Sequence, residues 1–167
     1  MPAVHLGLGS NLGNKGRNLA QACSILSELG VTIHTRSPIY ATEPVGFQQQ
    51  DWFLNQALAV EVDVDARTLL QACLQVESRM GRQRQVPGGP RAIDLDVLLY
   101  DDLVAHEPDL IIPHPRMHLR RFVLVPLAVI APQVIHPVLG KTIERLAAEC
   151  PDSSQVIPVG SLGPDLH

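Results

Sequence analysis

The order of strand-like and helix-like segments over the first hundred residues is the feature that most restricts the fold of this chain. Six segments show either the apolar runs and alternation of β-strands or the apolar spacing of amphipathic helices. In chain order these are strand 4–9, helix 17–29, strand 31–40, strand 54–62, helix 65–80 and strand 92–100. The order β-α-β-β-α-β is that of the split βαβ, or ferredoxin-like, arrangement. We therefore predict an α+β fold in which two helices cover one face of an antiparallel sheet.

Two more helices are expected in the C-terminal part, over residues 119–130 and 142–150. Pro126 lies inside the first of them and predicts a kink there. The sequence predicts no structure after Pro151, so residues 151–167 are a tail of undetermined structure. A chain of 167 residues is expected to form one domain, which would span residues 1–167.

Charge and composition argue against several classes of protein. The net charge of −4 argues against a general surface for nucleic acids or membranes. No N-terminal stretch resembles a signal peptide, and no apolar run is long enough to span a membrane. The three cysteines are scattered, which is typical of buried thiols in a reducing compartment rather than of disulfides or a zinc site. We expect a cytoplasmic protein without nucleic-acid or membrane partners, and a monomer, with the oligomeric state left open.

The stretch "GPRAIDLDVLLY" places two aspartates inside an otherwise apolar strand. Alternate residues of a strand point to the same face, so Asp94 and Asp96 should lie side by side. The opposite face should carry Ile93, Leu95 and Val97. Two carboxylates on one face suit divalent cations, because magnesium is commonly held by carboxylates together with substrate phosphates. The alternative is an edge strand whose solvated charges discourage aggregation.

Arginines gather around this strand. Seven of the thirteen basic residues lie between positions 79 and 121, and all are arginines: Arg79, Arg82, Arg84, Arg91, Arg116, Arg120 and Arg121. The forked guanidinium group suits bidentate binding of phosphate oxygens. For any single arginine, a solvated surface position is the alternative. Arginines next to two acidic metal ligands predict binding of a polyphosphate.

Aromatic residues are few and unevenly distributed. Three of the six, Phe47, Trp52 and Phe53, lie within seven positions, with Asn55 directly after them. One interpretation is that the rings anchor a long loop to the core. The other is a slot for a flat heteroaromatic ring, with stacking from the aromatics and an edge contact from the Asn55 amide.

Two further motifs give mainly negative predictions. The glycines of "GLGSNLG" match neither the dinucleotide motif nor the P-loop, so residues 10–16 are interpreted as a strand-to-helix turn, with a contribution to a binding site as the alternative. His114 and His118 have the spacing of zinc ligands on a helix, but Pro115 argues against a regular helix there. A phosphate contact or a structural role is expected for either histidine.

Several motifs together resemble one enzyme family. They are "GLGSNLG" at 7–13, "SPIYATEPVGFQQQDWFLNQAL" at 37–58, "ESRMGRQR" at 77–84, "GPRAIDLDVLL" at 89–99 and "IPHPRMHLRRFVLVPLAVIAP" at 112–132. In this order they resemble the 6-hydroxymethyl-7,8-dihydropterin pyrophosphokinases of folate biosynthesis. The resemblance implies a ferredoxin-like fold and the transfer of a diphosphate from ATP to the hydroxymethyl group of the pterin, with release of AMP.

The resemblance also implies roles for individual residues. Asp94 and Asp96 would hold two magnesium ions, and Arg82 and Arg91 would stabilise the transition state, so that these four form the catalytic set. The implied ATP-binding residues are Gln75, Glu77, Arg82, Arg84, Arg91, His114 and Arg120. The implied pterin-binding residues are Thr42, Val45, Gly46, Phe53, Asn55, Asp94 and Phe122, with the pterin stacked between the two phenylalanines.

This chain departs from the family pattern at two positions, and two other functions are compatible with the fold. Gly88 stands where an aromatic is frequent in the family, and Gln85 where some members have lysine, so closure of the loop 82–90 over the site would be weaker or use other contacts.

A ferredoxin-like domain can also bind RNA through exposed aromatics and a basic face. A non-catalytic ATP-binding regulator on the same fold is the third reading.

Overall fold

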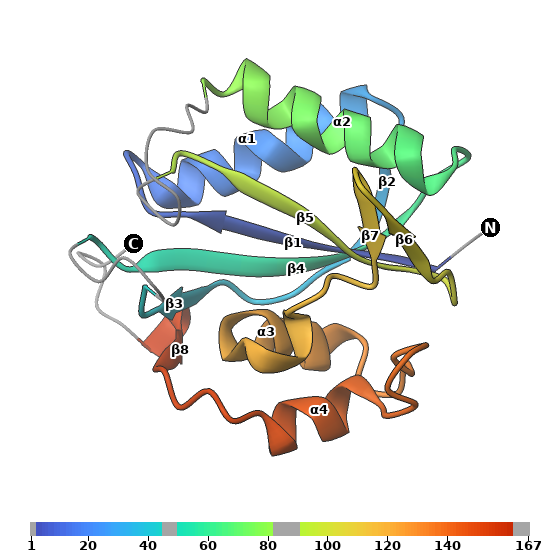
Figure 1. Cartoon of the computed structure of the whole chain (residues 1–167). Helices are drawn as coiled ribbons and strands as arrows, with labels where there is room; N and C mark the ends of the chain where they lie inside the picture. The colour runs from blue at the N-terminus through green and yellow to red at the C-terminus, as the bar shows by residue number, and fades with distance from the viewer. Residues whose placement is uncertain (1–2, 45–49, 82–90, 162–167) are drawn as a thin grey trace.

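The computed structural model describes residues 3–44, 50–81 and 91–161 (Figure 1). Its elements are β1 (Val4–Ser10), α1 (Lys15–Glu28), β2 (Thr32–Arg36), β3 (Tyr40–Thr42), β4 (Phe53–Glu61), α2 (Ala66–Arg79), β5 (Asp94–Tyr100), β6 (Ala105–Glu107), β7 (Leu110–Ile112), α3 (Arg121–Ile130), α4 (Ile143–Glu149) and β8 (Val156–Pro158), with 3-10 turns at Met117–Leu119 and Val159–Ser161.

The sheet has the predicted topology. Its strand order is β5-β1-β4-β3-β8, with β2 also paired to β4, and every pairing is antiparallel. Figure 1 shows α1 and α2 on one face of this sheet and α3 and α4 on the other. The α+β, ferredoxin-like prediction is therefore confirmed, and the C-terminal helices form a third layer.

Local capping explains where the two long helices begin and end. The side chain of Asn14 accepts a hydrogen bond from the backbone N–H of Arg17 at the start of α1, and Asp65 does the same for Thr68 at the start of α2. Gly30 follows α1 with a φ of +93°, a conformation that glycine adopts without strain. The helix predicted over 17–29 therefore begins two residues earlier than expected, because the cap is Asn14.

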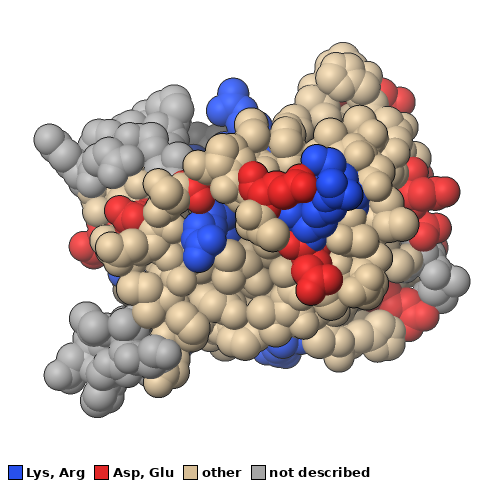
Figure 2. All heavy atoms as spheres, turned by 90° about the horizontal axis from the view of Figure 1, so that it is seen from below, with Lys and Arg blue, Asp and Glu red and all other residues tan. Residues whose placement is uncertain are grey.

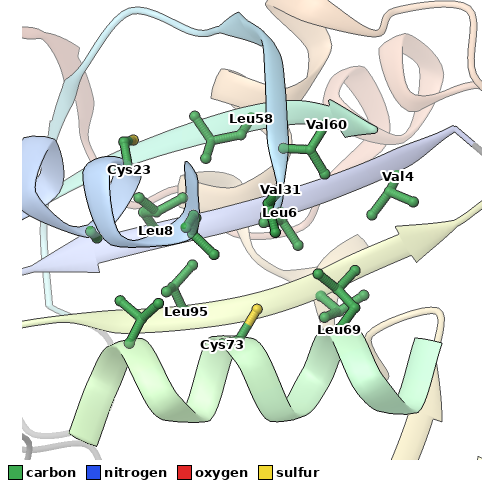
Figure 3. Packing of buried hydrophobic residues seen from close by; sticks show 14 of the residues in the cluster. Val4, Leu6, Leu8, Cys23, Val31, Leu58, Val60, Leu69, Cys73 and Leu95 are labelled. Atoms are coloured by element: carbon green, nitrogen blue, oxygen red, sulfur yellow. The ribbon is translucent and has the colours of Figure 1, made fainter. Parts of the chain in front are cut away.

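The main core lies between the sheet and the pair α1 and α2. In Figure 3, Leu6 and Leu8 of β1 point toward the helices together with Leu58 of β4 and Leu95 of β5, while Cys73 points from α2 toward the sheet. All of these side chains are at most 4 % exposed. A sheet face sealed this tightly leaves only the opposite face for a binding site.

The strand predicted over 31–40 is wrong as a single element. The chain breaks at Ser37 and Pro38 into β2 and β3, which both pair with β4. The hydroxyl of Ser37 accepts a hydrogen bond from Ala57 N–H at 2.9 Å, and Pro38 has no N–H to donate to a ladder. This break produces the short strand β3, whose residue Thr42 lines the cleft described below.

The C-terminal part contains the two predicted helices and more. α3 continues through Pro126, which forfeits one backbone hydrogen bond, while Leu124 and Leu127 are fully buried against the sheet. Thr142 caps α4 by accepting from Arg145 N–H. The hairpin β6–β7 and the strand β8 were not predicted from the sequence. None of the helices in the described segments is both long and apolar enough to cross a membrane.

His5 is a buried polar residue on the face of β1 away from the main core. It is 5 % exposed, and its Nδ1 has no hydrogen-bond partner among the described residues. Burial lowers the pKa of His5 below its usual value of 6.5. The folded state therefore binds a proton less readily than the unfolded chain, so stability present above pH 6.5 is lost as the pH falls below it.

We predict that His5→Leu reduces this acid sensitivity. The slope of the free energy of unfolding between pH 6.5 and 5 should be shallower by up to about 1.4 kcal/mol per pH unit, because at most one proton uptake is removed. Urea titrations at several pH values measure it. Thr35→Leu, at an exposed position of β2 without a titratable group, is the control and should leave the slope near that of the wild type. An unchanged slope in His5→Leu would contradict the assignment.

Candidate active site

A cleft of about 360 Å³ opens on the sheet face opposite α1 and α2. It is lined by Gly9, Thr42, Glu43, Phe53, Asn55, Arg91, Asp94, Arg116, Arg120 and Phe122. A narrower hollow beside it, between β5, β1 and α3, is lined by both Asp94 and Asp96. Residues from β1, β3, β4, β5 and the start of α3 thus meet at one place, and a volume of this size is ordinary for a small-molecule site.

The two aspartates lie side by side on β5, as predicted. Asp94 is paired across the ladder with Gly9, and Asp96 with Gly7, so the neighbouring strand presents no side chain beside either carboxylate. Ile93, Leu95 and Val97 belong to the main core on the opposite face. Arg91 Nη1 lies 3.1 Å from Asp94 Oδ2, which supplies a positive charge near the pair. Asp94 therefore faces the cleft, and Asp96 faces the adjoining hollow rather than the interior.

This arrangement fits magnesium bound together with phosphates. Among residues 3–44, 50–81 and 91–161, no three His, Cys, Asp or Glu side chains converge as a complete metal site. Magnesium is commonly held by one or two carboxylates, with phosphates and water as further ligands. Two half-buried hard-oxygen donors at the edge of an open cleft are such a partial site.

Asn55 is held in one orientation by the strands around it. Thr42 Oγ1 donates to Asn55 Oδ1 at 2.5 Å, and Asn55 Nδ2 donates to the carbonyl of Leu8 at 3.2 Å. Thr42 is 1 % exposed and Asn55 8 %. A side chain at Gly9 would place its Cβ 2.7 Å from Asn55 Nδ2, so only glycine fits there without displacing the amide. One lone pair of Oδ1 and one N–H of Asn55 remain for a ligand.

Phe53 and Phe122 both line the cleft, from β4 and from the first turn of α3. The guanidinium of Arg120 lies over the ring of Phe122, 5.7 Å from its centre. Phe53 of the aromatic cluster thus lines the cleft with Phe122 and Asn55, while a slot for a flat ring stays a prediction. Trp52 is on the surface, where Lys15 Nζ donates to its carbonyl at 2.8 Å, and Phe47 lies outside the described residues.

His114 is half-buried close to the charged end of the cleft. Burial is the largest effect on its ring, and together with the charges of Arg120 and Arg116 it lowers the pKa of His114 to about 4, although Asp94 acts in the opposite direction. The ring is therefore neutral near pH 7. Its Nδ1 accepts from Arg116 N–H at 3.2 Å, which leaves the proton on Nε2 as a donor for a ligand.

His118 does not join His114 in a metal site. Residues 117–119 form a 3-10 turn after Pro115, and the His118 ring packs edge-on against His136, with 6.4 Å between the ring centres. The prediction that Pro115 prevents a regular helix here is confirmed.

Gln75 and Glu77 lie on α2, on the far side of the sheet from the cleft lining. Glu77 is 4 % exposed, and its carboxylate accepts a hydrogen bond from Leu95 N–H at 2.9 Å, between the two aspartates of β5. Gln75 is exposed. Burial, reinforced by the charges of Glu77 and Asp96, raises the pKa of the nearby Cys73 thiol to about 12. The structure therefore shows Glu77 bound to the back of β5, while a nucleotide contact of either residue stays a prediction.

Besides Phe47, six positions named in the sequence analysis lie outside the described residues: Val45, Gly46, Arg82, Arg84, Gln85 and Gly88. Of the other clustered arginines, Arg91, Arg116 and Arg120 line the cleft, and Arg79 pairs with Glu28 at 3.4 Å instead. Arg116 was not among the predicted site residues.

Asn11 holds several segments of the site together through hydrogen bonds, although the sequence analysis did not name it as a site residue. It is 2 % exposed at the end of β1. Its Oδ1 accepts from Arg91 N–H at 2.7 Å, and its own N–H donates to the Arg91 carbonyl at 3.0 Å. Its Nδ2 donates to Gln50 Oε1 at 2.7 Å and to the carbonyl of Asp51 at 3.2 Å. The only sequence signal was its place in "GLGSNLG", a turn already considered as part of a site.

Charges on the face beneath the sheet are mixed. Figure 2 shows that face, where basic and acidic side chains are interspersed rather than gathered into a basic field. Lys141 and Arg145 both pair with Glu149 of α4, each at 2.8 Å. The basic face required by the RNA-binding reading is not found in this view.

The α+β fold holds a cleft with carboxylates and arginines at one end and two phenylalanines at the other, an arrangement that suits an enzyme of phosphate transfer. The model of the 7,8-dihydro-6-hydroxymethylpterin-pyrophosphokinase (HPPK) family matches residues 5–132. The chain belongs to this family. The expected activity, transfer of pyrophosphate from ATP to hydroxymethyldihydropterin in folate biosynthesis, is thereby confirmed.

Relatives agree with this membership, and a solved structure agrees with the fold. A 2-amino-4-hydroxy-6-hydroxymethyldihydropteridine pyrophosphokinase of Methylorubrum extorquens is 41% identical over 89% of this chain and 94% of its own length. The pyrophosphokinase of the same name from Bacillus subtilis is 43% identical over 78% of this chain and 79% of its own length. The crystal structure of Plasmodium falciparum HPPK-DHPS has a TM-score of 0.69 at 16% identity, covering 89% of this chain and 44% of that longer chain. The last likeness concerns the fold alone.

We predict that Asn11→Ala impairs both stability and turnover. Loss of its buried hydrogen bonds should lower the free energy of unfolding by about 2–3 kcal/mol, because the amide groups of Arg91 and Gln50 lose their partner. Turnover should fall because the Arg91 backbone is no longer held beside Asp94. Asn14→Ala, which removes only an exposed helix cap, should cost about 1 kcal/mol with normal turnover. Equal effects of the two substitutions would contradict the role given to Asn11.

Proposed function

We propose that the cleft binds the pterin at its aromatic end and the phosphates of ATP at its charged end, so that the diphosphate is transferred beside Asp94. The observation that carries this proposal is that Asn55, Phe122 and Asp94 line one cleft of about 360 Å³. The pterin ring would stack between Phe53 and Phe122, and its reacting hydroxymethyl group would point toward Asp94.

Recognition of the pterin rests on the orientation of Asn55. Because Thr42 occupies one lone pair of Oδ1 and Leu8 one N–H, the amide offers a fixed acceptor and donor pair to the ring edge. A freely rotating amide would offer either order of the two groups. Val45 and Gly46 are assigned to the same subsite by the resemblance alone.

The phosphate end is assigned to arginines and His114. Arg91, Arg116 and Arg120 line the cleft and provide the bidentate donors that phosphate oxygens favour. Neutral His114 adds an N–H donor without a further charge. Arg82, Arg84, Gln75 and Glu77 complete the ATP set by the family resemblance.

Asp94 and Asp96 are proposed to hold two magnesium ions together with the phosphates. When bound, these ions neutralise phosphate charge and favour attack on the β-phosphorus. The chain's own contribution is positioning: Asn55 and the two phenylalanines hold the hydroxymethyl oxygen in line with the β-phosphorus, and AMP leaves from the opposite side. Arg91 and Arg82 stabilise charge that develops on the transferring group.

The domain organisation, the cellular location and the oligomeric state are part of the same proposal. One domain over residues 1–167 is supported by the tail, whose strand β8 joins the main sheet. A cytoplasmic location is supported by the free thiols of Cys23, Cys73 and Cys150. We propose a monomer as the active form.

The nucleotide product tests the function directly. Incubation with ATP, magnesium and 6-hydroxymethyl-7,8-dihydropterin should release AMP and not ADP, in amounts equal to the pterin diphosphate formed. ADP as the product would overturn the diphosphate transfer. ATP binding without turnover would favour the regulator reading, and a shift of single-stranded RNA at physiological salt would favour the RNA-binding one.

We predict that Asp94→Ala or Asp96→Ala slows turnover by at least about 1000-fold, which corresponds to about 4 kcal/mol of barrier. The fold should survive, because removal of either carboxylate relieves the repulsion between them. Thermal unfolding together with magnesium-dependent turnover measures both. Asp102→Ala, an exposed aspartate just beyond the same strand, is the control and should retain full activity. A variant of Asp94 or Asp96 with near wild-type turnover would show that the metal assignment is wrong.

We predict that Phe122→Ala weakens pterin binding and leaves ATP binding near normal. The lost stacking contact should cost roughly 1 kcal/mol or more in pterin affinity. Separate calorimetric titrations with ATP and 6-hydroxymethylpterin measure the two affinities. Val129→Ala, an exposed position on the same helix, serves as control. Equal losses for both ligands would indicate a disturbed fold instead of a pterin contact.

A further inference from the structure

The segment that follows α4 returns to the cleft. Residues 152–158, called here the C-terminal segment, run from the end of α4 to β8 at the edge of the main sheet (Figure 1). They lie beyond residues 5–132, the part that matches the family model. The segment contacts both walls of the cleft at positions next to proposed pterin-binding residues.

The first contact is at the start of α3. Asp152 Oδ2 accepts a hydrogen bond from Arg121 N–H at 3.0 Å. The residue in the N-cap position, Arg120, makes no side-chain cap bond, so the carboxylate of Asp152 provides the cap from 31 residues further along the chain. A negative charge at a helix start is favourable, because the first N–H groups lack partners within the helix. Phe122 is the next residue of this turn.

The second contact is at the opposite wall. β8 pairs with β3 in antiparallel register, with Val156 opposite Thr42. Glu43 N–H donates to the Gln155 carbonyl at 3.2 Å, and the Glu43 carboxylate accepts from Gln155 N–H. Thr42 is the residue whose hydroxyl orients Asn55.

One carboxylate links the two contacts. While Oδ2 of Asp152 caps α3, its Oδ1 accepts from both the N–H and the hydroxyl of Ser154, at 2.9 and 2.5 Å. Partial burial acts to raise the pKa of Asp152, but these three hydrogen bonds together with the charge of Arg121 outweigh it and lower the pKa below its usual value. The first turn of α3 is only half-buried, whereas Leu124 and Leu127 in later turns are fully buried. The start of the helix therefore depends more on Asp152 than its later turns do.

We propose that Asp152 is a positioning residue for the pterin subsite, joining the Phe122 wall to the β8–β3 edge that carries Thr42 and so setting the width of the aromatic slot. The inference rests on the proposed function, which assigns Phe122 and Thr42 to the pterin. Arg120 is less affected, since its backbone N–H is bonded to the Met117 carbonyl at 3.3 Å in the preceding turn. Loss of the Asp152 link should therefore act on the pterin rather than on ATP.

Asp152→Asn tests this link with almost no change in size. An amide has one acceptor oxygen in place of two, so it can cap α3 or bind Ser154 but cannot do both as the carboxylate does. The dissociation constant for 6-hydroxymethylpterin should rise at least fivefold, and that for a non-hydrolysable ATP analogue with magnesium should change by less than twofold. Ser154→Ala removes one bond to the same carboxylate and should give a smaller rise. Ser153→Ala, at the exposed neighbouring position, should bind both ligands as the wild type does.

The possible outcomes distinguish the positioning role of Asp152 from the assignment of Phe122 to the pterin subsite. Unchanged pterin affinity in Asp152→Asn would overturn the proposal, and so would equal weakening of both ligands. If Asp152→Asn does not fold, Ser154→Ala decides, and an unchanged pterin affinity there overturns the proposal. Phe122→Ala is titrated in parallel: no effect in that variant would refute the pterin subsite, whereas an effect in Phe122→Ala without one in Asp152→Asn would refute the positioning role alone.

Discussion

The pairing of β1 with β4 on one side and β5 on the other is the interaction on which the rest of the structure depends. It brings Asn55 of β4 and the two aspartates of β5 onto the same face, one strand apart on each side. Gly7 and Gly9 of β1 lie between them without side chains. A Cβ at Gly9 would collide with the Asn55 amide, and one at Gly7 would lie 3.3 Å from the Leu98 side chain. The bare centre of the sheet thus makes room for the cleft.

The two faces of the sheet serve different purposes because they are covered differently. α1 and α2 seal one face with large apolar side chains, which gives the strands a rigid support. On the other face α3 lies over part of the sheet, and its second and later turns pack on a smaller apolar cluster that includes Leu98 and Leu124. The first turn of α3 carries Phe122 to the edge of the uncovered part. The part of this face that α3 leaves uncovered carries residues of opposite charge, with Arg91 beside Asp94.

Three polar side chains from distant segments hold the site in position, and those of Asn11 and Glu77 are buried. Asn11 binds the backbone of Arg91 and of Asp51, Glu77 binds Leu95 N–H of β5, and Asp152 binds the start of α3. Each is a side chain that satisfies a backbone N–H outside regular secondary structure or at its border. Buried groups of this kind are costly to leave unpaired, so the elements that they join are held to one relative placement.

The sequence by itself determined the order of the elements, the helix caps at Asp65 and Gly30, and the side-by-side placement of Asp94 and Asp96. These properties are local, because they follow from periodicity and from the conformational preferences of single residues. The division of residues 31–40 into two strands, the strand β8 and the roles of Asn11 and Asp152 were decided only by the tertiary structure. Each of them depends on a hydrogen bond to a residue distant in the chain, as Ser37 with Ala57 or Asp152 with Arg121. Such a pairing has no period and no local propensity, and among the neighbouring residues only Pro38, which cannot donate to a ladder, indicates a break.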